Sequence, residues 1–183
     1  MAPSLLAPRL AVSVLLVLAA ASAAAADGIG SGGGGMMHLH FFFHEVFTAG
    51  PNGTTATVAA PARSGGSFFG FVGVVDDMLR EGADPASRLV GRAQGVTAGT
   101  SLADGAITTM LNLVFTEGPY AGSTLQVFGR ALLGTVMERP VVGGTGKFRM
   151  ARGYTLSRRV NSSDPDNLLV IEYDAYVTTS PIN

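Results

Sequence analysis

The sequence predicts an all-β domain, because three features occur together. Short segments rich in Val, Phe, Thr, Leu and Tyr recur along the chain, and Gly, Pro, Asn and Asp occupy the gaps between them. Several segments alternate polar and apolar residues with the period of two that a half-buried strand requires. No stretch carries a sustained helical stripe. About eight strands in this length fit an antiparallel barrel or a sandwich, and we favour the barrel because closure leaves no exposed strand edge.

The N-terminal segment, residues 1–26, has the layout of a secretory signal peptide. A short basic region precedes an uncharged apolar run over residues 10–21, and small residues that suit cleavage follow it. A retained membrane anchor is the alternative, but the run is short for a bilayer span. Residues 27–36 are rich in glycine and predict a flexible linker. The folded domain is therefore expected over residues 37–183.

Composition and two local motifs point to an extracellular protein. The chain contains no cysteine, so the domain must rely on its own core rather than on disulfides. N-glycosylation sequons begin at Asn52 and Asn161, in stretches that resemble exposed loops. The formal net charge is −1 and no basic run occurs, which argues against nucleic acid as a partner. We expect a secreted glycoprotein that is not embedded in a membrane.

The strands are expected in the segments that combine β-formers with alternation. The clearest alternation lies within the 106–116, 123–132 and 168–178 segments. A glycine-rich stretch at residues 143–146 lacks the spacing of a phosphate loop, and we interpret it as a hairpin turn that leads into a strand containing Phe148. In chain order the expected strands are 38–47, 54–60, 67–75, 88–97, 106–116, 123–132, 147–157 and 168–178.

The first of these strands carries all three histidines of the chain, His38, His40 and His44. Alternation places them with Phe42 on one face of the strand, whereas Glu45 lies on the other face. His40 and His44 are about 13 Å apart at the usual rise per residue. No further His or Cys exists to complete a metal site. We therefore interpret the segment as a barrel strand without metal, and alternation alone does not decide which face looks inward.

Five ordered sequence blocks resemble the plant dirigent proteins. The resemblance covers residues 38–178 and implies an eight-stranded antiparallel β-barrel of the calycin or allene-oxide-cyclase type. It also implies a homo-oligomer, commonly a trimer, secreted to the apoplast of the plant cell wall. The blocks are FFFHE at 41–45, FG at 69–70 with VVDD at 74–77, VGRAQG at 90–95, FTEGPYAGSTL at 115–125 and VVGGTGKFRMARGY at 141–154.

The dirigent resemblance implies a function. Family members bind monolignol-derived phenoxy radicals and guide their stereoselective coupling in lignan and phenylpropanoid biosynthesis. A separate laccase or peroxidase performs the oxidation, so we expect a guide protein with no cofactor and no oxidase activity of its own. Two alternatives stay open. Some relatives cyclise quinone methides without a cofactor, and a wall protein can also serve defence by binding alone.

The resemblance also assigns pocket residues. Asp76, which we slightly favour, or Asp77 would protonate or orient a phenolic oxygen if apolar surroundings raise its pKa, and a turn or helix cap is the structural alternative. Arg152 would bind a phenolate or methoxy oxygen, and a surface or ion-paired arginine is the alternative. These three are the expected catalytic residues. Further substrate-binding residues are expected at Phe42, His44, Thr97, Lys147, Phe148 and Tyr154.

Three positions depart from the lignan-forming dirigent proteins. Those members often carry a tyrosine near the position of Thr97, and aspartates where Glu45 and Lys147 stand. A lost phenol and a reversed charge change what the pocket can bind. The resemblance therefore predicts the family and leaves the substrate and the handedness of the product open.

Overall fold

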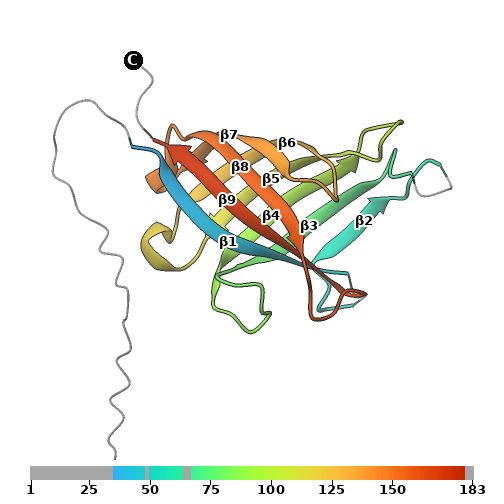
Figure 1. Ribbon diagram of the computed structural model, residues 1–183, viewed down its shortest axis with the longest axis horizontal. Helices are drawn as coiled ribbons and strands as arrows, with labels where there is room; N and C mark the ends of the chain where they lie inside the picture. The colour runs from blue at the N-terminus through green and yellow to red at the C-terminus, as the bar shows by residue number, and fades with distance from the viewer. Residues whose placement is uncertain (1–34, 48–49, 64–66, 180–183) are drawn as a thin grey trace, which may run out of the picture. The chain divides into compact units, whose positions relative to one another are not determined.

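The computed structural model describes residues 35–47, 50–63 and 67–179, which form a β-barrel (Figure 1). The predicted signal peptide and residues 27–34 of the predicted linker lie outside the described residues. Among the described residues, no helix is long and apolar enough to cross a membrane. The elements are β1 (Met37–Val46), β2 (Thr55–Ala59), β3 (Val72–Arg80), β4 (Leu89–Gly99), β5 (Ile107–Phe115), η1 (Gly118–Tyr120), β6 (Thr124–Ala131), β7 (Met137–Thr145), η2 (Gly146–Phe148), β8 (Arg152–Val160) and β9 (Leu168–Thr178), where η denotes a 3-10 helix.

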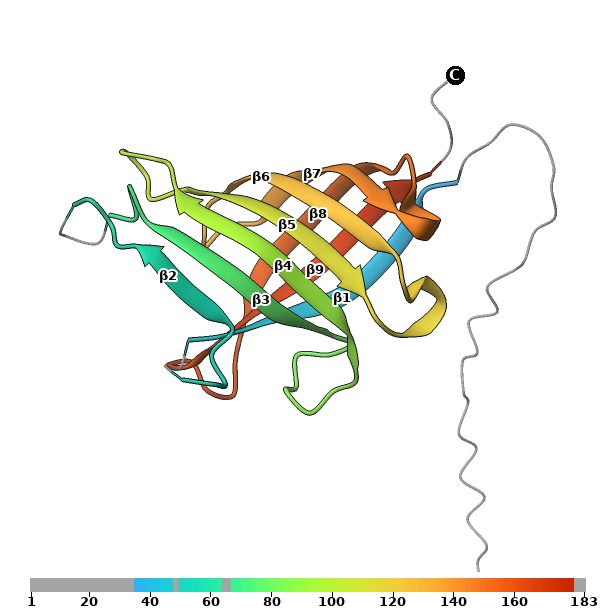
Figure 2. The ribbon, with the colours of Figure 1, turned by 180° about the vertical axis from the view of Figure 1, so that it is seen from behind.

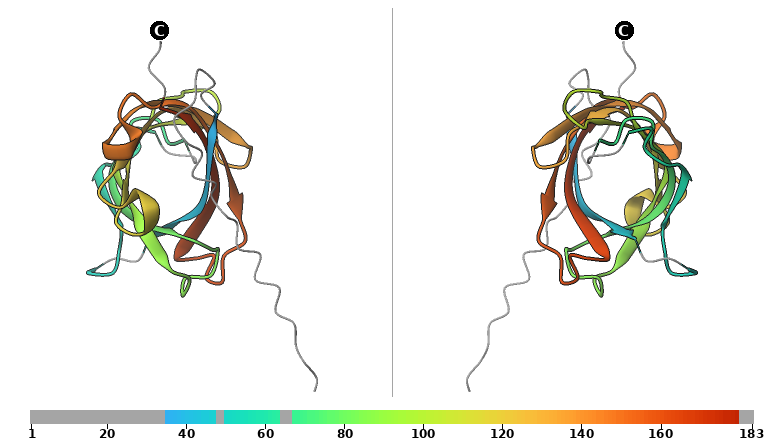
Figure 3. Two further views of the ribbon diagram at one scale, coloured as in Figure 1. Left: turned by 90° about the vertical axis from the view of Figure 1, so that its left-hand side faces the viewer. Right: turned by 90° about the vertical axis from the view of Figure 1, so that its right-hand side faces the viewer.

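The first strand closes the barrel. β1 pairs with β9 along its whole length, and its Phe42–His44 stretch also pairs with β3. All pairings are antiparallel, and the remaining strands follow one another from β3 to β9 (Figure 2). The strands form a closed ring when viewed end on (Figure 3). The predicted eight-stranded antiparallel barrel is confirmed. The short β2 corresponds to the expected strand 54–60 and pairs with β3.

The barrel interior takes one face of each strand. On β1, Phe41 and Phe43 point inward and are buried, whereas His38 and His40 are exposed. Phe41 stacks on Tyr173 of β9 with ring centroids 5.4 Å apart. The odd-numbered residues of β1 therefore face the barrel interior. Pairing with β9 places Phe41 and Phe43 of β1 among the core residues of β9.

The three histidines serve separate contacts on the outer face. His38 bonds Asp174 at 2.7 Å and His40 bonds Glu172 at 3.0 Å. His44 is fully buried, and its Nε2 lies 3.0 Å from the carbonyl oxygen of Gly82. Burial lowers the pKa of His44, which favours the neutral imidazole. Within the described residues, no group of three His, Cys, Asp or Glu side chains is placed to share a metal ion.

Strand β7 is an element that the sequence analysis missed. The stretch around residues 143–146 was expected to be a hairpin turn, but Gly143 and Gly144 belong to β7 and the strand β8 begins only at Arg152. A Cβ on Gly144 would lie 2.5 Å from the Thr124 carbonyl oxygen and 2.7 Å from the Phe148 carbonyl oxygen. The glycine run therefore permits close packing of η2 against the sheet rather than a tight turn.

A proline within β7 is a second reason why this strand is hard to predict from the sequence. Pro140 has no N–H to donate, which usually argues against a paired strand. The β6–β7 ladder ends at the pair Val127–Val141, so Pro140 removes no donor from that ladder. Arg139 and Val141 on either side of it are buried, as alternation requires.

Candidate functional site

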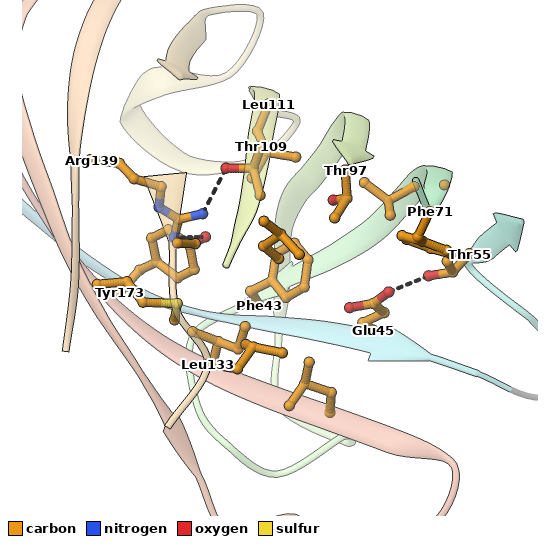
Figure 4. Close-up of a pocket in the computed structure, with 17 residues that line it drawn as sticks. Phe43, Glu45, Thr55, Phe71, Thr97, Thr109, Leu111, Leu133, Arg139 and Tyr173 are labelled. Atoms are coloured by element: carbon orange, nitrogen blue, oxygen red, sulfur yellow. Dashed lines mark hydrogen bonds between the residues drawn. The ribbon is translucent and has the colours of Figure 1, made fainter. Parts of the chain in front are cut away.

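The barrel encloses a cavity of about 70 Å³ (Figure 4). Its walls come from the strands β1 to β7 and β9 and from the loop residues Phe71 and Leu133. Most of the wall is apolar, and it includes Phe43, Val75, Leu111 and Ile171. Figure 4 shows two polar ends. Glu45 and Thr55 lie at one end, and Arg139 and Tyr173 lie at the other.

The acidic end combines two carboxyl groups on neighbouring strands. The β1–β3 ladder ends at the pair His44–Met78. Glu45 and Asp77 are the next residues of the two strands, and they lie close enough for the Glu45 carboxyl to raise the pKa of Asp77. The Thr55 hydroxyl donates to Oε1 of Glu45 at 2.5 Å. The Thr54 hydroxyl donates to Oδ1 of Asp77. Both threonines belong to the turn and strand that follow β1, so β1, β2 and β3 build this end of the cavity together.

The two carboxyl groups differ in exposure and in acidity. Asp77 is 0% exposed, and its Oδ2 has no hydrogen-bond partner among the described residues. Burial, followed by the nearby Glu45 carboxyl, raises the pKa of Asp77 to about 8. Burial also raises the pKa of Glu45, and the hydrogen bond from Thr55 opposes that shift. At neutral pH Asp77 therefore keeps its proton, and the neighbouring Glu45 carboxyl faces the cavity.

The basic end is built around Arg139 of β7, which is 2% exposed. Its terminal nitrogens donate to Thr109 at 3.0 Å, to Ser157 at 2.7 Å and to the Tyr173 hydroxyl at 2.5 Å. The guanidinium carbon also lies 5.1 Å from the centroid of the Tyr173 ring. Four strands, β5, β7, β8 and β9, thus position one cation at the cavity wall.

The expected acidic residues separate to the two sides of β3. Asp77 points inward, whereas Asp76 is exposed on the outer face, where the Arg92 side chain donates to it at 2.5 Å. The expected strand 67–75 ended just before both residues, but β3 continues to Arg80 and they lie in its middle. Two aspartates can lie in the middle of this strand because Asp76 pairs with Arg92 and buried Asp77 is neutral.

The structure places the expected binding residues at several separate locations. Thr97 lines the cavity. Arg152 is exposed and donates to the Val142 and Ala151 carbonyl oxygens at 3.0 and 2.8 Å. Neither Arg152 nor any of the others, Phe42, His44, Lys147, Phe148 and Tyr154, is among the residues that line the cavity.

Phe148 and Tyr154 each pack against neighbouring aromatic rings outside the cavity. Phe148 is fully buried in η2, and its ring packs against Phe115 and Tyr120 at the end of the barrel. Tyr154 stacks on Tyr176 of the neighbouring strand, with ring centroids 5.1 Å apart. Thr97 thus lines the same cavity as Glu45 and Arg139. The sequence indicated Glu45 as a departure from the lignan-forming dirigent proteins, and it gave no indication of Arg139. If β7 had been recognised as a strand, its period of two would have indicated that Arg139 points inward, because Arg139 lies on the same face of the strand as the buried residues Met137 and Val141.

Comparison with known proteins identifies the family. The family model of dirigent-like proteins matches residues 36–178. The chain belongs to the dirigent family. This dirigent protein is 41% identical over 140 residues to Dirigent protein 1 of Arabidopsis thaliana, a match that covers 75% of this chain and 76% of that protein. It is 37% identical over 142 residues to Pterocarpan synthase 1 of Glycine max, covering 75% of this chain and 76% of the relative.

Solved dirigent structures share the fold. The structure of the pterocarpan synthase dirigent protein GePTS1 superposes with a TM-score of 0.72 at 34% identity, covering 85% of this chain and 92% of that chain. The family resemblance predicted from the sequence is thereby confirmed. The family contains members that are named as synthases, so membership by itself does not separate a guide protein from an enzyme.

Proposed function

We propose that this dirigent protein is a cofactor-free enzyme that cyclises a quinone methide within a single phenolic molecule. The observation that carries the proposal is the carboxyl pair at the cavity, in which Asp77 holds a proton at neutral pH and Glu45 faces the substrate space. Carboxyl groups whose pKa values are shifted by their surroundings, at the wall of a cavity, are typical of acid–base chemistry. Glu45 acts as the general base.

The proposed step is an isomerisation that needs no oxidant or reductant. The Glu45 carboxylate removes the proton from a phenol of the substrate while that phenol oxygen forms a bond to the methide carbon. The electron pair of the exocyclic C=C bond moves into the ring, and the ring carbonyl oxygen becomes a phenolate. This phenolate then takes a proton from water and Glu45 returns its own proton to water, so atoms and charge balance. Asp77 stays neutral and acts as a positioning residue, because a second negative charge beside Glu45 would disfavour the carboxylate.

Cavity size favours one substrate molecule. Ligand sites usually measure roughly 300–1,000 Å³, whereas this cavity measures about 70 Å³. Two separate phenoxy radicals would have to displace more of the wall than a single substrate whose two phenol rings are joined covalently. Coupling of monolignol radicals, which the family resemblance implies, is therefore the second candidate, and it requires a separate laccase or peroxidase as a partner.

One experiment distinguishes these functions. A phenol that generates a quinone methide and carries a second phenol group is incubated with the protein and no oxidase, and the product is resolved by chiral chromatography. We expect faster cyclisation and an excess of one enantiomer. A parallel reaction contains coniferyl alcohol and laccase. Stereoselective product only in the laccase reaction would replace our proposal with the radical-coupling role, and bias in neither would indicate a binding protein.

We also propose a homo-oligomer that associates through the outer face of β5, β6 and β7. Met110, Phe128 and Val142 form an apolar patch there, with Met110 and Phe128 47% and 46% exposed and paired across the two strands. A trimer is the assembly implied by the dirigent resemblance. The proposed setting is the apoplast, which the exposed positions of Asn52 and Asn161 support because both sequons are accessible to glycosylation.

The apolar patch yields a direct prediction. Replacing Phe128 with lysine is expected to convert the oligomer to a monomer, because a charge cannot be buried without a partner. Light scattering coupled to size exclusion measures the mass. Leu102→Lys is the matched control, since Leu102 is 59% exposed in a loop away from the patch. A Phe128→Lys protein with the mass of the wild type would exclude this face as the interface.

A further inference from the structure

Arg139 is a buried cation that no carboxylate of the described residues neutralises. A guanidinium stays charged in proteins, and a buried charge is costly unless it is paired. The hydrogen-bond partners of Arg139 are three hydroxyl groups, and none of the ion pairs among the described residues includes it. Its Nε is also buried without a partner in that part of the chain. The side chain therefore retains both charge and donor capacity.

This cation lies at the wall of the cavity. Arg139, Thr109 and Tyr173 line it together, at the end opposite to Glu45 (Figure 4). Phe43 lies between the two ends in the same view. A flat ring in the cavity thus has apolar and aromatic walls along its faces, a carboxyl group at one edge and a guanidinium at the other.

We propose that Arg139 forms an oxyanion site that binds the phenolate oxygen of the substrate. The inference rests on the proposed function, because the cyclisation step places a full negative charge on the ring oxygen. Donors that are already oriented in a site shielded from water stabilise such a charge far better than water does. The hydroxyl groups of Thr109, Ser157 and Tyr173 hold the guanidinium in place before the substrate binds, so Arg139 acts as a catalytic residue and the hydroxyls position it.

The single oxygen and the aromatic walls favour a phenolate over larger anions. A phosphate or sulfate brings several charged oxygens that need more donors than one guanidinium offers. The ring of Tyr173 lies directly beside the cation, and Phe43 faces the same space, so an aromatic ligand gains stacking contacts that a small inorganic anion does not.

The test uses 4-nitrophenol, whose ionised form is yellow and whose binding requires no turnover. We expect the wild-type protein to lower the apparent pKa of the bound probe by at least about one unit, because an opposite charge nearby favours the ionised form. Arg139→Met is expected to abolish this shift, and Arg139→Lys to retain part of it. Arg130→Met is the matched control, since Arg130 is exposed and pairs with Asp104.

The outcomes separate this inference from the proposed function. A wild-type protein that leaves the pKa of the bound probe unchanged overturns the oxyanion site, as does a folded Arg139→Met protein that keeps the shift. If Arg139→Met fails to fold, Arg139→Gln decides, because glutamine is neutral and can still bond the neighbouring hydroxyls. A retained shift in a protein without cyclase activity would overturn the proposed reaction and leave the phenolate site standing.

Discussion

Replacing Glu45 with glutamine is expected to lower the rate of cyclisation by at least about 100-fold, which is the usual contribution of a general base. Glutamine preserves the size of the side chain and can still accept the Thr55 hydrogen bond, but it cannot take a proton from the substrate. The fold is expected to stay intact, because Glu45 lies at the cavity rather than in the packed core. Initial rates of the oxidase-free reaction measure the effect.

The pH dependence adds a second readout for Glu45. Burial raises the pKa of this carboxyl, so wild-type activity should fall as the pH drops through that raised value and the base becomes protonated. The Glu45→Gln variant should lack this acidic limb. Glu138→Gln is the matched control, since Glu138 is exposed on β7 next to Arg139. A Glu45→Gln protein with wild-type rates would show that the base lies elsewhere.

Replacing Asp77 with asparagine is expected to make the protein more stable at neutral pH. The pKa of Asp77 is about 8 in the folded protein and 3.8 as its ordinary value. Between these values the folded state binds more protons than the unfolded state, so the stability of the wild type falls as the pH rises. By this linkage the penalty reaches at most roughly 4 kcal/mol near pH 7.

Asparagine cannot ionise, so the variant escapes this penalty and can still accept the hydrogen bond from Thr54. Urea unfolding at pH 5 and pH 8 measures the effect. The advantage of Asp77→Asn over the wild type should be larger at pH 8. Comparing the two proteins at each pH removes the contribution of Glu45, which has the same sign. Asp76→Asn is the control on the exposed face, and unfolding midpoints for Asp77→Asn that follow the wild type across pH would contradict the assignment.

The sequence predicted the barrel correctly because the signals for it are local. Alternation identified segments that overlap β1, β4, β5, β6 and β9, and each turn between them carries residues suited to a tight change of direction. The same method failed for β7, where Pro140 and two glycines imitate a turn. Pro140 is tolerated because of where the β6–β7 ladder ends, and the glycines are required because η2 packs closely against the sheet. Neither property can be predicted from the residues next to them in the sequence.

The sequence indicated some of the residues at the candidate site and missed others. The family blocks indicated Asp76 and Asp77, of which the structure places only Asp77 inside the barrel. Thr97, which was named as a departure from the family, lines the cavity. The family blocks also named Arg152, which lies outside the cavity, and they gave no indication of Arg139. Arginine is usually a surface residue, and only burial among three hydroxyl groups from other strands distinguishes this one.

By itself, the sequence determined the family, the all-β class and the period with which each strand alternates, because these depend on neighbours along the chain. The tertiary structure decided which face of β1 looks inward, that Glu45 meets Asp77, and that Arg139 stands at the opposite end of the cavity. These are contacts between distant strands, and the closing pairing of β1 with β3 and β9 sets them. The raised pKa of Asp77 has the same origin, since burial and the neighbouring carboxyl exist only after the barrel has closed.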